Sequence, residues 1–413
     1  MAEIIGGLGL SHTPTIGYAL DAAKENDPAW QPVFAAFDPV KAWLVANKPD
    51  AAIVIYNDHV TSFFFDHYSA FALGVGAEWR PADEGGGARE IAPLKGHPKL
   101  ARHVGQSLMR QEFDMAFFQE RALDHGCFSP LSMLSERGQP LDFPVIPLAA
   151  GVLQLPIPSA QRCFNLGKAI RQAIAEYPEE MNVVIIGTGG LSHQVHGERA
   201  GFNNSDWDAR FLELIASDPA KLAQMTHAEL AEIGGWESME VIMWLIMRGA
   251  LSDNLEIVSK QYCLPSMTGI GTLVLKERAP LPSVPVATEP FNLPGTHPFD
   301  LEVSAKAYTL NAFLHKLADV THREAFRTHP EDTMRAFDLS ETERALISQN
   351  DWIGLIHAGA IFFGLEKLAA IQGIPNAVVY AGMRGETLAE FQASRNAPGA
   401  LYSTGKTKVE CDD

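Results

Sequence analysis

Three histidines of the chain stand at equivalent places, each a few residues after a short apolar run. His12 closes the quartet Gly-Leu-Ser-His at 9–12, and His193 closes the same quartet at 190–193. His59 ends the similar stretch Tyr-Asn-Asp-His at 56–59. A single histidine is more often an ordinary core or surface residue, but packing rarely requires an imidazole and a hydroxyl at the end of a strand. The repetition therefore indicates a shared site.

Such a site has the composition of a metal centre. Several histidines without cysteines suit zinc, iron, manganese or copper, and the third ligand decides among them. The four cysteines have no C-x-x-C spacing, whereas the stretch 235–240 offers two carboxylates, Glu237 and Glu240. Two imidazoles and one carboxylate form the facial triad of non-heme Fe(II) oxygenases. Some zinc hydrolases use the same trio, so both classes stay open.

Other motifs in the chain do not match known nucleotide-binding or phosphate-binding sites. The run Ile4–Gly17 contains G-x-G, but His12 occupies the place of the third glycine of a dinucleotide fingerprint, and no Gly-Lys-Ser/Thr follows. We interpret its glycines as leaving room beside a metal site. The stretch 84–87, Glu-Gly-Gly-Gly, reads as a flexible turn. His125, beside Asp124 in a predicted loop, is a further candidate for chemistry.

The elements that must position these residues alternate between strand and helix. Strands are expected at 4–10, 51–56, 145–148, 183–186, 256–262 and 269–275, with helices at 160–176, 207–216 and 237–248. This alternation predicts an α/β fold with a central sheet flanked by helices. If the strands preceding His12, His59 and His193 are parallel neighbours, the three side chains meet at the carboxyl edge of the sheet.

The character of the chain changes at a proline-rich segment. Six prolines occur within 279–298, which predicts a linker between a catalytic domain at 1–278 and a small all-α domain at 299–413. Helices are expected at 302–317 and 351–371, with another starting at Ser340. A tail from Gly382 onwards is expected to lie against another surface.

Composition limits the partners of the protein. The 413 residues carry a formal net charge of −18, which argues against nucleic acid and anionic membrane surfaces. No apolar run approaches the length needed to cross a membrane, and no secretory signal is recognisable at the N-terminus. A cytoplasmic protein is the expectation.

Five motifs together resemble a known family. They are L-S-H-T-P at 10–14, N-D-H-V at 57–60, L-D-H-G at 123–126, G-T-G-G-L-S-H-Q-V-H-G at 187–197 and W-E-S-M-E-V-I-M-W-L-I-M-R-G-A at 236–250. The set resembles the class III (type II) extradiol dioxygenases of the protocatechuate 4,5-dioxygenase group. Residues 1–278 are similar to the catalytic β subunit of that group, and about 300–395 to its small helical α subunit, here fused in one chain.

The resemblance implies residue roles. Iron ligands fall on His12, His59 and Glu240, with Glu237 as the alternative to Glu240. The acid/base histidine falls on His193, and a second active-site histidine falls on His125. Thr13 and Thr268 match positions near the substrate. The implied cofactor is Fe(II), and the implied reaction is extradiol ring cleavage by O2 of a substrate with adjacent hydroxyls.

A fused chain of this length resembles the members of the group that cleave gallate, giving an oxalomesaconate-type product. Protocatechuate and 3-O-methylgallate remain alternative substrates, because the motifs fix the reaction better than the substrate. The extra hydroxyl of gallate needs a polar partner. We expect it from the C-terminal tail, from Glu386 and Tyr402, either in the same protomer or across a dimer, and we predict a homodimer.

Overall fold

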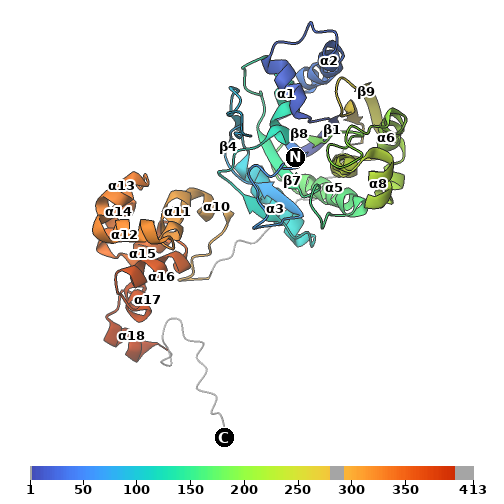
Figure 1. Ribbon diagram of the computed structural model, residues 1–413. Coiled ribbons are helices and arrows are strands. Elements are labelled where there is room, and N and C mark those ends of the chain that lie inside the picture. Colours follow the sequence, from blue (N-terminus) through green and yellow to red (C-terminus); the bar gives the residue numbers. More distant parts are fainter. Residues whose placement is uncertain (1, 280–292, 396–413) are drawn as a thin grey trace. The chain divides into compact units, whose positions relative to one another are not determined.

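The computed structural model describes residues 2–279 and 293–395, and the chain divides into two compact units, Met1–Thr288 and Glu289–Asp413. Figure 1 shows the first unit in blue to yellow and the second in orange to red. Most of the predicted linker, 280–292, lies outside the described residues. The α/β class and the helical C-terminal region are both confirmed.

The first unit is built on a mixed eight-stranded sheet. Its order is β6-β3-β7-β2-β8-β1-β10-β9. The bounds are β1 Ala2–Leu10, β2 Ala51–Tyr56, β3 Phe71–Gly74, β6 Ala116–Phe118, β7 Val145–Ala150, β8 Met181–Thr188, β9 Leu255–Cys263 and β10 Ile270–Glu277. A separate two-stranded sheet pairs β4 (Glu78–Trp79) with β5 (Leu94–Lys95).

The strands that precede the three histidines are direct parallel neighbours. β8 lies between β2 and β1, with Leu10 opposite Thr188 and Ile55 opposite Gly187. The three strands therefore end at the same edge of the sheet, where open α/β folds place their sites. The segments carrying His12, His59 and His193 all leave the sheet at this edge.

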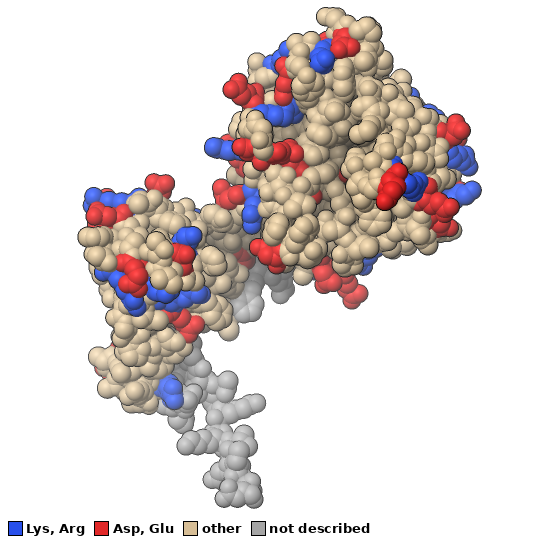
Figure 2. All heavy atoms as spheres, viewed as in Figure 1, with Lys and Arg blue, Asp and Glu red and all other residues tan. Residues whose placement is uncertain are grey.

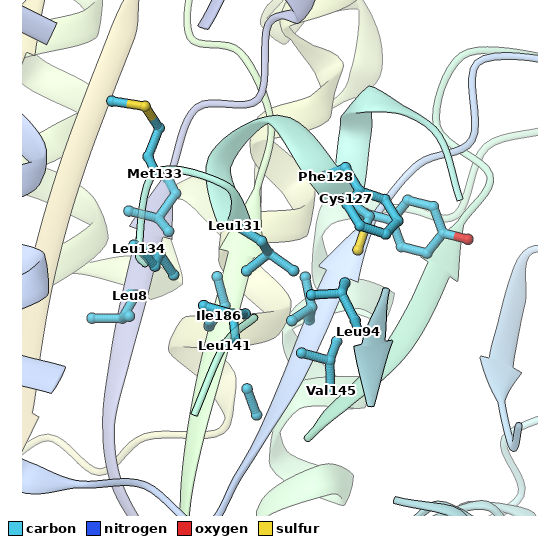
Figure 3. Packing of buried hydrophobic residues seen from close by; sticks show 14 of the residues in the cluster. Leu8, Leu94, Cys127, Phe128, Leu131, Met133, Leu134, Leu141, Val145 and Ile186 are labelled. Carbon is cyan, nitrogen blue, oxygen red and sulfur yellow. The ribbon is translucent and has the colours of Figure 1, made fainter. Parts of the chain in front are cut away.

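Helices cover both faces of the sheet. They are α1 Pro14–Asp21, α2 Gln31–Asn47, α3 Pro98–Arg110, α4 His125–Leu131, α5 Ala160–Ala175, α6 Ser205–Ser217, α7 Pro219–Ala223, α8 His227–Gly234, the 3₁₀ helix η1 Glu237–Glu240 and α9 Val241–Gly249. On one face, Leu8 and Ile186 of the sheet belong to a core with Leu131 of α4 and Leu134 (Figure 3). The single helix expected at 237–248 is instead η1 followed by α9.

The glycines of β1 serve the packing of α9 on the opposite face. Side chains alternate between the faces of a strand, so Gly7 and Gly9 point away from the core that contains Leu8. A Cβ added at Gly9 would overlap the Trp244 ring, and one at Gly7 would lie 2.5 Å from the sulfur of Met247. The space left by these glycines is thus filled by α9. Since Glu240 directly precedes α9, this packing also sets the distance of its carboxylate from β1.

The second unit is entirely helical in its described part. Its helices are α10 Leu301–Lys306, α11 Tyr308–Lys316, α12 Val320–Thr328, α13 Pro330–Ala336, α14 Glu341–Gln349, α15 Trp352–His357, α16 Phe362–Ile371, α17 Asn376–Met383 and α18 Leu388–Ser394. They enclose their own apolar core, which includes Leu310, Phe313 and Leu365.

Two expectations for this unit were wrong, and one helix was not predicted. The helix expected at 302–317 is interrupted at Ala307, and the one expected at 351–371 is interrupted between α15 and α16. Gly359 has a φ of +96° in that second break, a conformation that ends a right-handed helix. The predicted tail from Gly382 contains a further helix, α18, which begins with a capping box of Thr387 and Glu390.

Charged side chains of both signs are mixed on the surface. Figure 2 shows Lys and Arg interspersed with Asp and Glu on the visible face of each unit. Among the described residues, no helix has the length and apolarity needed to span a membrane.

Candidate active site

Two histidines and one carboxylate meet at the carboxyl edge of the sheet. His12 follows β1, His59 follows β2, and Glu240 is the last residue of η1. One ligand atom from each lies within 4.8 Å of the other two, a spacing that can hold a metal ion. The Nε2 atom of His12 is 3.1 Å from Oε2 of Glu240, and Nε2 of His59 is 3.4 Å from Oε1.

The surroundings of His12 direct its lone pair toward Glu240. The Thr188 hydroxyl donates to the carbonyl of Gly126 (3.1 Å), so it accepts a hydrogen bond from Nδ1–H of His12 at 2.9 Å. Burial lowers the pKa of His12, although Glu240 raises it, and the neutral form is favoured. Its Nε2 is then an unprotonated buried nitrogen without a hydrogen-bond partner.

His59 is held in the same tautomer by a buried carboxylate. Oδ2 of Asp124 accepts from the backbone N–H of His59 at 2.7 Å and from its Nδ1–H at 2.8 Å. Burial lowers the pKa of His59, but the carboxylates of Asp124 and Glu240 raise it to about 10. With Nδ1–H directed at Asp124, Nε2 faces Glu240, and a metal ion bound there would displace the proton that the raised pKa leaves on the ring. Carboxylates that orient metal-binding histidines in this way are a usual part of such sites.

Glu240 is almost fully buried and stays ionised. Burial raises its pKa, yet the neighbouring rings of His12 and His59 lower it well below the usual value. The backbone N–H of Gly190 also donates to Oε2 at 2.6 Å. Asn57 adds a contact from its Nδ2, at 3.4 Å from Oε1. The carboxylate is thus anchored on one side and open to the two imidazoles on the other.

These donors fit a divalent transition metal. Two imidazole nitrogens and one carboxylate converge in a buried place, and Nε2 of His12 has no partner there. A cation bound by all three satisfies the orphaned nitrogen and balances the buried charge. The trio predicted from the sequence is thus brought together by the fold.

Glu237, the alternative ligand, is engaged by groups outside the trio. Its Oε1 lies 2.5 Å from Nδ1 of His196, and its Oε2 accepts from the backbone N–H of Val195 at 3.0 Å. It does not belong to a metal-binding group among the described residues, whereas Glu240 does. The geometry therefore favours Glu240 over Glu237.

A cavity of about 650 Å³ opens over the three convergent groups. His193 and His125 both lie in its wall, as do Thr13 and Thr268. The volume is in the range of small-molecule sites. Every candidate residue of the first unit named from the sequence therefore lines this one cavity.

His193 is kept apart from the metal-binding trio. Its Nδ1 donates to the carbonyl of Leu191 at 2.8 Å, which leaves Nε2 unprotonated in the neutral ring. The preceding Ser192 is fixed by Asp208, which accepts from its backbone N–H and its hydroxyl, both at 2.7 Å. Burial raises the pKa of Asp208. His193 thus lies in the cavity wall with its ring held by the Leu191 carbonyl.

His125 is the first residue of α4, and it stacks on His59. The ring centroids are 3.9 Å apart, with an angle of 28° between the planes. Its Nδ1 lies 2.5 Å from Oε2 of Glu84. Four residues of this region were not assigned from the sequence: Asn57, Glu84, Asp124 and Thr188. Asn57, Asp124 and Thr188 lie within the motifs quoted from the sequence, whereas Glu84 belongs to the stretch that was read only as a flexible turn.

Two predicted site residues remain, Glu386 in the second unit and Tyr402 beyond the residues that the structure describes. Glu386 pairs with Arg384 at 2.8 Å and accepts from Ser394 at 3.1 Å. Tyr402 lies outside the described residues. The expected contacts of these two with the substrate stay predictions.

A trio that could hold a metal ion, with two further histidines at the carboxyl edge of an α/β sheet, is the arrangement expected of a metal-dependent enzyme. Residues 6–275 match the family model described as the catalytic LigB subunit of aromatic ring-opening dioxygenase. Residues 310–396 match the LigA subunit of the LigAB aromatic-ring-opening dioxygenase. The chain belongs to this family and is an aromatic ring-cleavage dioxygenase, with both parts in one polypeptide. The family implies a metal cofactor.

Individual relatives narrow the comparison. A gallate dioxygenase of Pseudomonas putida is 51% identical over 336 residues, which cover 79% of this chain and 99% of that protein. A 2,3-dihydroxyphenylpropionate/2,3-dihydroxicinnamic acid 1,2-dioxygenase of Pseudomonas putida is 27% identical, covering 59% of this chain and 88% of the relative. A solved structure of an uncharacterized protein from Escherichia coli K12 aligns with a TM-score of 0.42 at 13% identity, covering 65% of this chain and 99% of that one. The predicted family is confirmed.

Proposed function

We propose that this protein is an Fe(II)-dependent extradiol dioxygenase that cleaves the ring of gallate with O2 to an oxalomesaconate-type product. One observation carries the proposal. His12, His59 and Glu240 converge beneath a cavity that is also lined by His193 and His125. The 51% identity to a gallate dioxygenase supports the choice of substrate.

The three convergent groups would hold Fe(II) on one side only. Two neutral imidazoles and one carboxylate leave a divalent ion with net positive charge and open positions. When bound, the metal would supply Lewis acidity and redox chemistry toward O2 and a ring that carries adjacent hydroxyls. Asp124 and Thr188 keep both imidazoles in the tautomer that presents Nε2 to the ion.

The protein itself moves the protons. A ring hydroxyl must lose a proton when the substrate binds, and ring opening needs a proton returned. His193 suits both steps because its Nδ1–H is committed to the Leu191 carbonyl, so Nε2 can accept a proton and later return it. His125 accepts a hydrogen bond from a second substrate hydroxyl. Burial around the site keeps bulk water from competing for these groups.

Substrate selection rests on polar groups around the ring. The Thr13 and Thr268 side chains lie in the cavity wall, mostly buried, and supply hydroxyls for the ring substituents. We assign the third hydroxyl of gallate to Glu386 and Tyr402, in a homodimeric assembly. A site that hydrogen-bonds this hydroxyl discriminates against analogues without it. Protocatechuate and 3-O-methylgallate are the alternative substrates.

Oxygen uptake by the anaerobically iron-loaded protein tests this function. Gallate, protocatechuate and 3-O-methylgallate are supplied in turn, and the products are identified by mass. We expect uptake to be fastest with gallate, and faster uptake with another substrate would replace gallate in the proposal. Oxygen-independent turnover by a zinc-loaded protein would instead indicate a hydrolase.

Three further features belong to the same proposal. We infer a catalytic domain at 1–278, a linker at 279–298 and a helical domain at 299–413. We also infer a homodimer and a cytoplasmic location. Analytical ultracentrifugation of the purified protein measures whether it is a homodimer. A monomer at the concentrations used for the activity assay would contradict a site that is shared between protomers.

A further inference from the structure

The glycine-rich turn at 84–87 contributes a carboxylate that contacts His125, one of the residues lining the cavity. Glu84 contacts His125 at two points: Oε1 accepts from the backbone N–H at 2.8 Å, and Oε2 lies 2.5 Å from Nδ1 of the ring. Both oxygens of one carboxylate are therefore used by one histidine. The sequence pattern indicated only a flexible turn at this place.

The turn is fixed so that Glu84 reaches this position. Asp83 accepts hydrogen bonds from the backbone N–H groups of Gly85 and Gly87, at 2.8 and 2.9 Å. The chain before it is tied to the segment before His125, since the N–H of Ala82 donates to the carbonyl of Leu123 at 2.8 Å. The backbone bond of Ala82 to Leu123 thus brings Glu84 next to His125, and Asp83 fixes the turn that follows.

The contact decides which ring nitrogen carries the proton. An ionised carboxylate only accepts hydrogen bonds, so Nδ1 of His125 must donate. The neutral ring then has its lone pair on Nε2, at the opposite edge, as the nitrogen available to the cavity. The face of the ring is already confined by His59, whose ring stacks on it at 3.9 Å. Glu84 therefore fixes the edge of the His125 ring that carries Nδ1, while His59 confines the face of the ring.

We propose that Glu84 is a positioning residue that holds His125 in the Nδ1–H tautomer and so presents Nε2 as a hydrogen-bond acceptor for a substrate hydroxyl. The inference rests on the proposed function for the identity of that hydroxyl. The relation repeats the one between Asp124 and His59, where a carboxylate takes both the backbone N–H and Nδ1–H. Asp124 acts on a metal-binding histidine, whereas Glu84 acts on one that faces the substrate.

Exchange of the carboxylate for an amide gives a specific test. In Glu84→Gln, the amide oxygen can still accept from the backbone N–H of His125, but the NH2 group faces Nδ1 and donates to it. The ring must then carry its proton on Nε2, so this nitrogen changes from a hydrogen-bond acceptor to a donor. In serine proteases, the corresponding exchange beside the catalytic histidine lowers kcat about 10⁴-fold because the tautomer is wrong.

The tautomer is read by ¹⁵N NMR of histidine-labelled full-length protein loaded with diamagnetic zinc, with His125→Gln used to assign the signals. We expect protonated Nδ1 in the wild type and protonated Nε2 in Glu84→Gln. Glu90→Gln, an exposed neighbour, is the matched control and should match the wild type. Protonated Nε2 in the wild type, or the same tautomer in wild type and Glu84→Gln, would overturn the proposal.

Kinetics on the iron-loaded variants give the second measurement. Glu84→Gln should lower kcat at least about tenfold with bound iron unchanged, and Glu84→Asp should recover less than half of that loss because its side chain is one methylene shorter. Unchanged kcat in Glu84→Gln would contradict the positioning role. The NMR result needs no turnover, so a wild-type protein inactive on gallate would remove the proposed substrate without deciding the role of Glu84.

Discussion

Nε2 of His12 lies 3.1 Å from Oε2 of Glu240, although the two residues come from opposite ends of the catalytic unit in sequence. Since Thr188 accepts the Nδ1–H of His12, the facing nitrogen carries a lone pair, and two electron-rich atoms meet in a buried place. A bound cation removes the repulsion between them. The pair is thus arranged for a metal ion.

Loss of the Glu240 carboxylate should abolish tight metal binding. Glu240→Gln removes the anionic donor. We expect the affinity of this variant for Fe(II) or Zn²⁺ to fall by more than the roughly 10–100-fold that is typical when a residue that hydrogen-bonds a metal ligand is replaced. Competition titration with a chelator measures it. Glu237→Gln is the matched control and should keep wild-type affinity, because Glu237 is engaged with His196. The reverse result would make Glu237 the ligand.

Removal of the Asp124 carboxylate, which hydrogen-bonds His59, should weaken metal binding less than the loss of the Glu240 carboxylate does. In Asp124→Asn the amide no longer fixes Nδ1–H of His59, and we expect metal affinity to fall roughly 10–100-fold. The same titration applies, with the exposed Asp66→Asn as control. An affinity equal to that of the wild type would mean that Asp124 does not orient His59.

The base at the cavity wall should be separable from metal binding. His193→Phe keeps a ring of similar size but no acceptor, so kcat should fall about 10²–10⁴-fold while bound iron stays stoichiometric. Iron content is measured by elemental analysis and turnover by oxygen uptake. The exposed His67→Phe should behave as the wild type. Loss of iron in His193→Phe would make His193 a ligand.

The close packing of β1 on α9 should contribute to the free energy of unfolding. A methyl group at Gly9 overlaps the Trp244 ring, and we expect Gly9→Ala to lower the free energy of unfolding by about 1–3 kcal/mol. Urea denaturation measures the change. Gly86→Ala, where a Cβ meets no atom within 4 Å, is the control. A Gly9→Ala protein as stable as the control would show that α9 can shift without cost.

The residues assigned to the third hydroxyl should affect substrates unequally. Glu386→Gln and Tyr402→Phe should each lower kcat/KM for gallate about tenfold, equivalent to one lost hydrogen bond of roughly 1.4 kcal/mol. Protocatechuate lacks that hydroxyl, so its kcat/KM should change less. Equal losses for both substrates would remove the discriminating role.

The sequence by itself determined the elements and the types of residue at their ends. Apolar runs and turn residues predicted the strands before His12, His59 and His193, because burial of a strand requires a local pattern that one chain segment displays. The repeated Gly-Leu-Ser-His quartets also indicated the chemistry. Long helices in the second unit were predicted less well, since breaks such as the one at Gly359 depend on a single backbone conformation.

Only the tertiary structure decided which partners these residues have. The strand order brings β1, β8 and β2 together, and α9 packs on the glycines of β1 so that Glu240, rather than Glu237, faces the two imidazoles. The tautomers of His12, His59 and His125 are set by Thr188, Asp124 and Glu84, which lie far away in sequence or carry no motif of their own. Hydrogen bonds between distant segments leave no periodic signal, because they depend on distances and directions that exist only after the chain has folded.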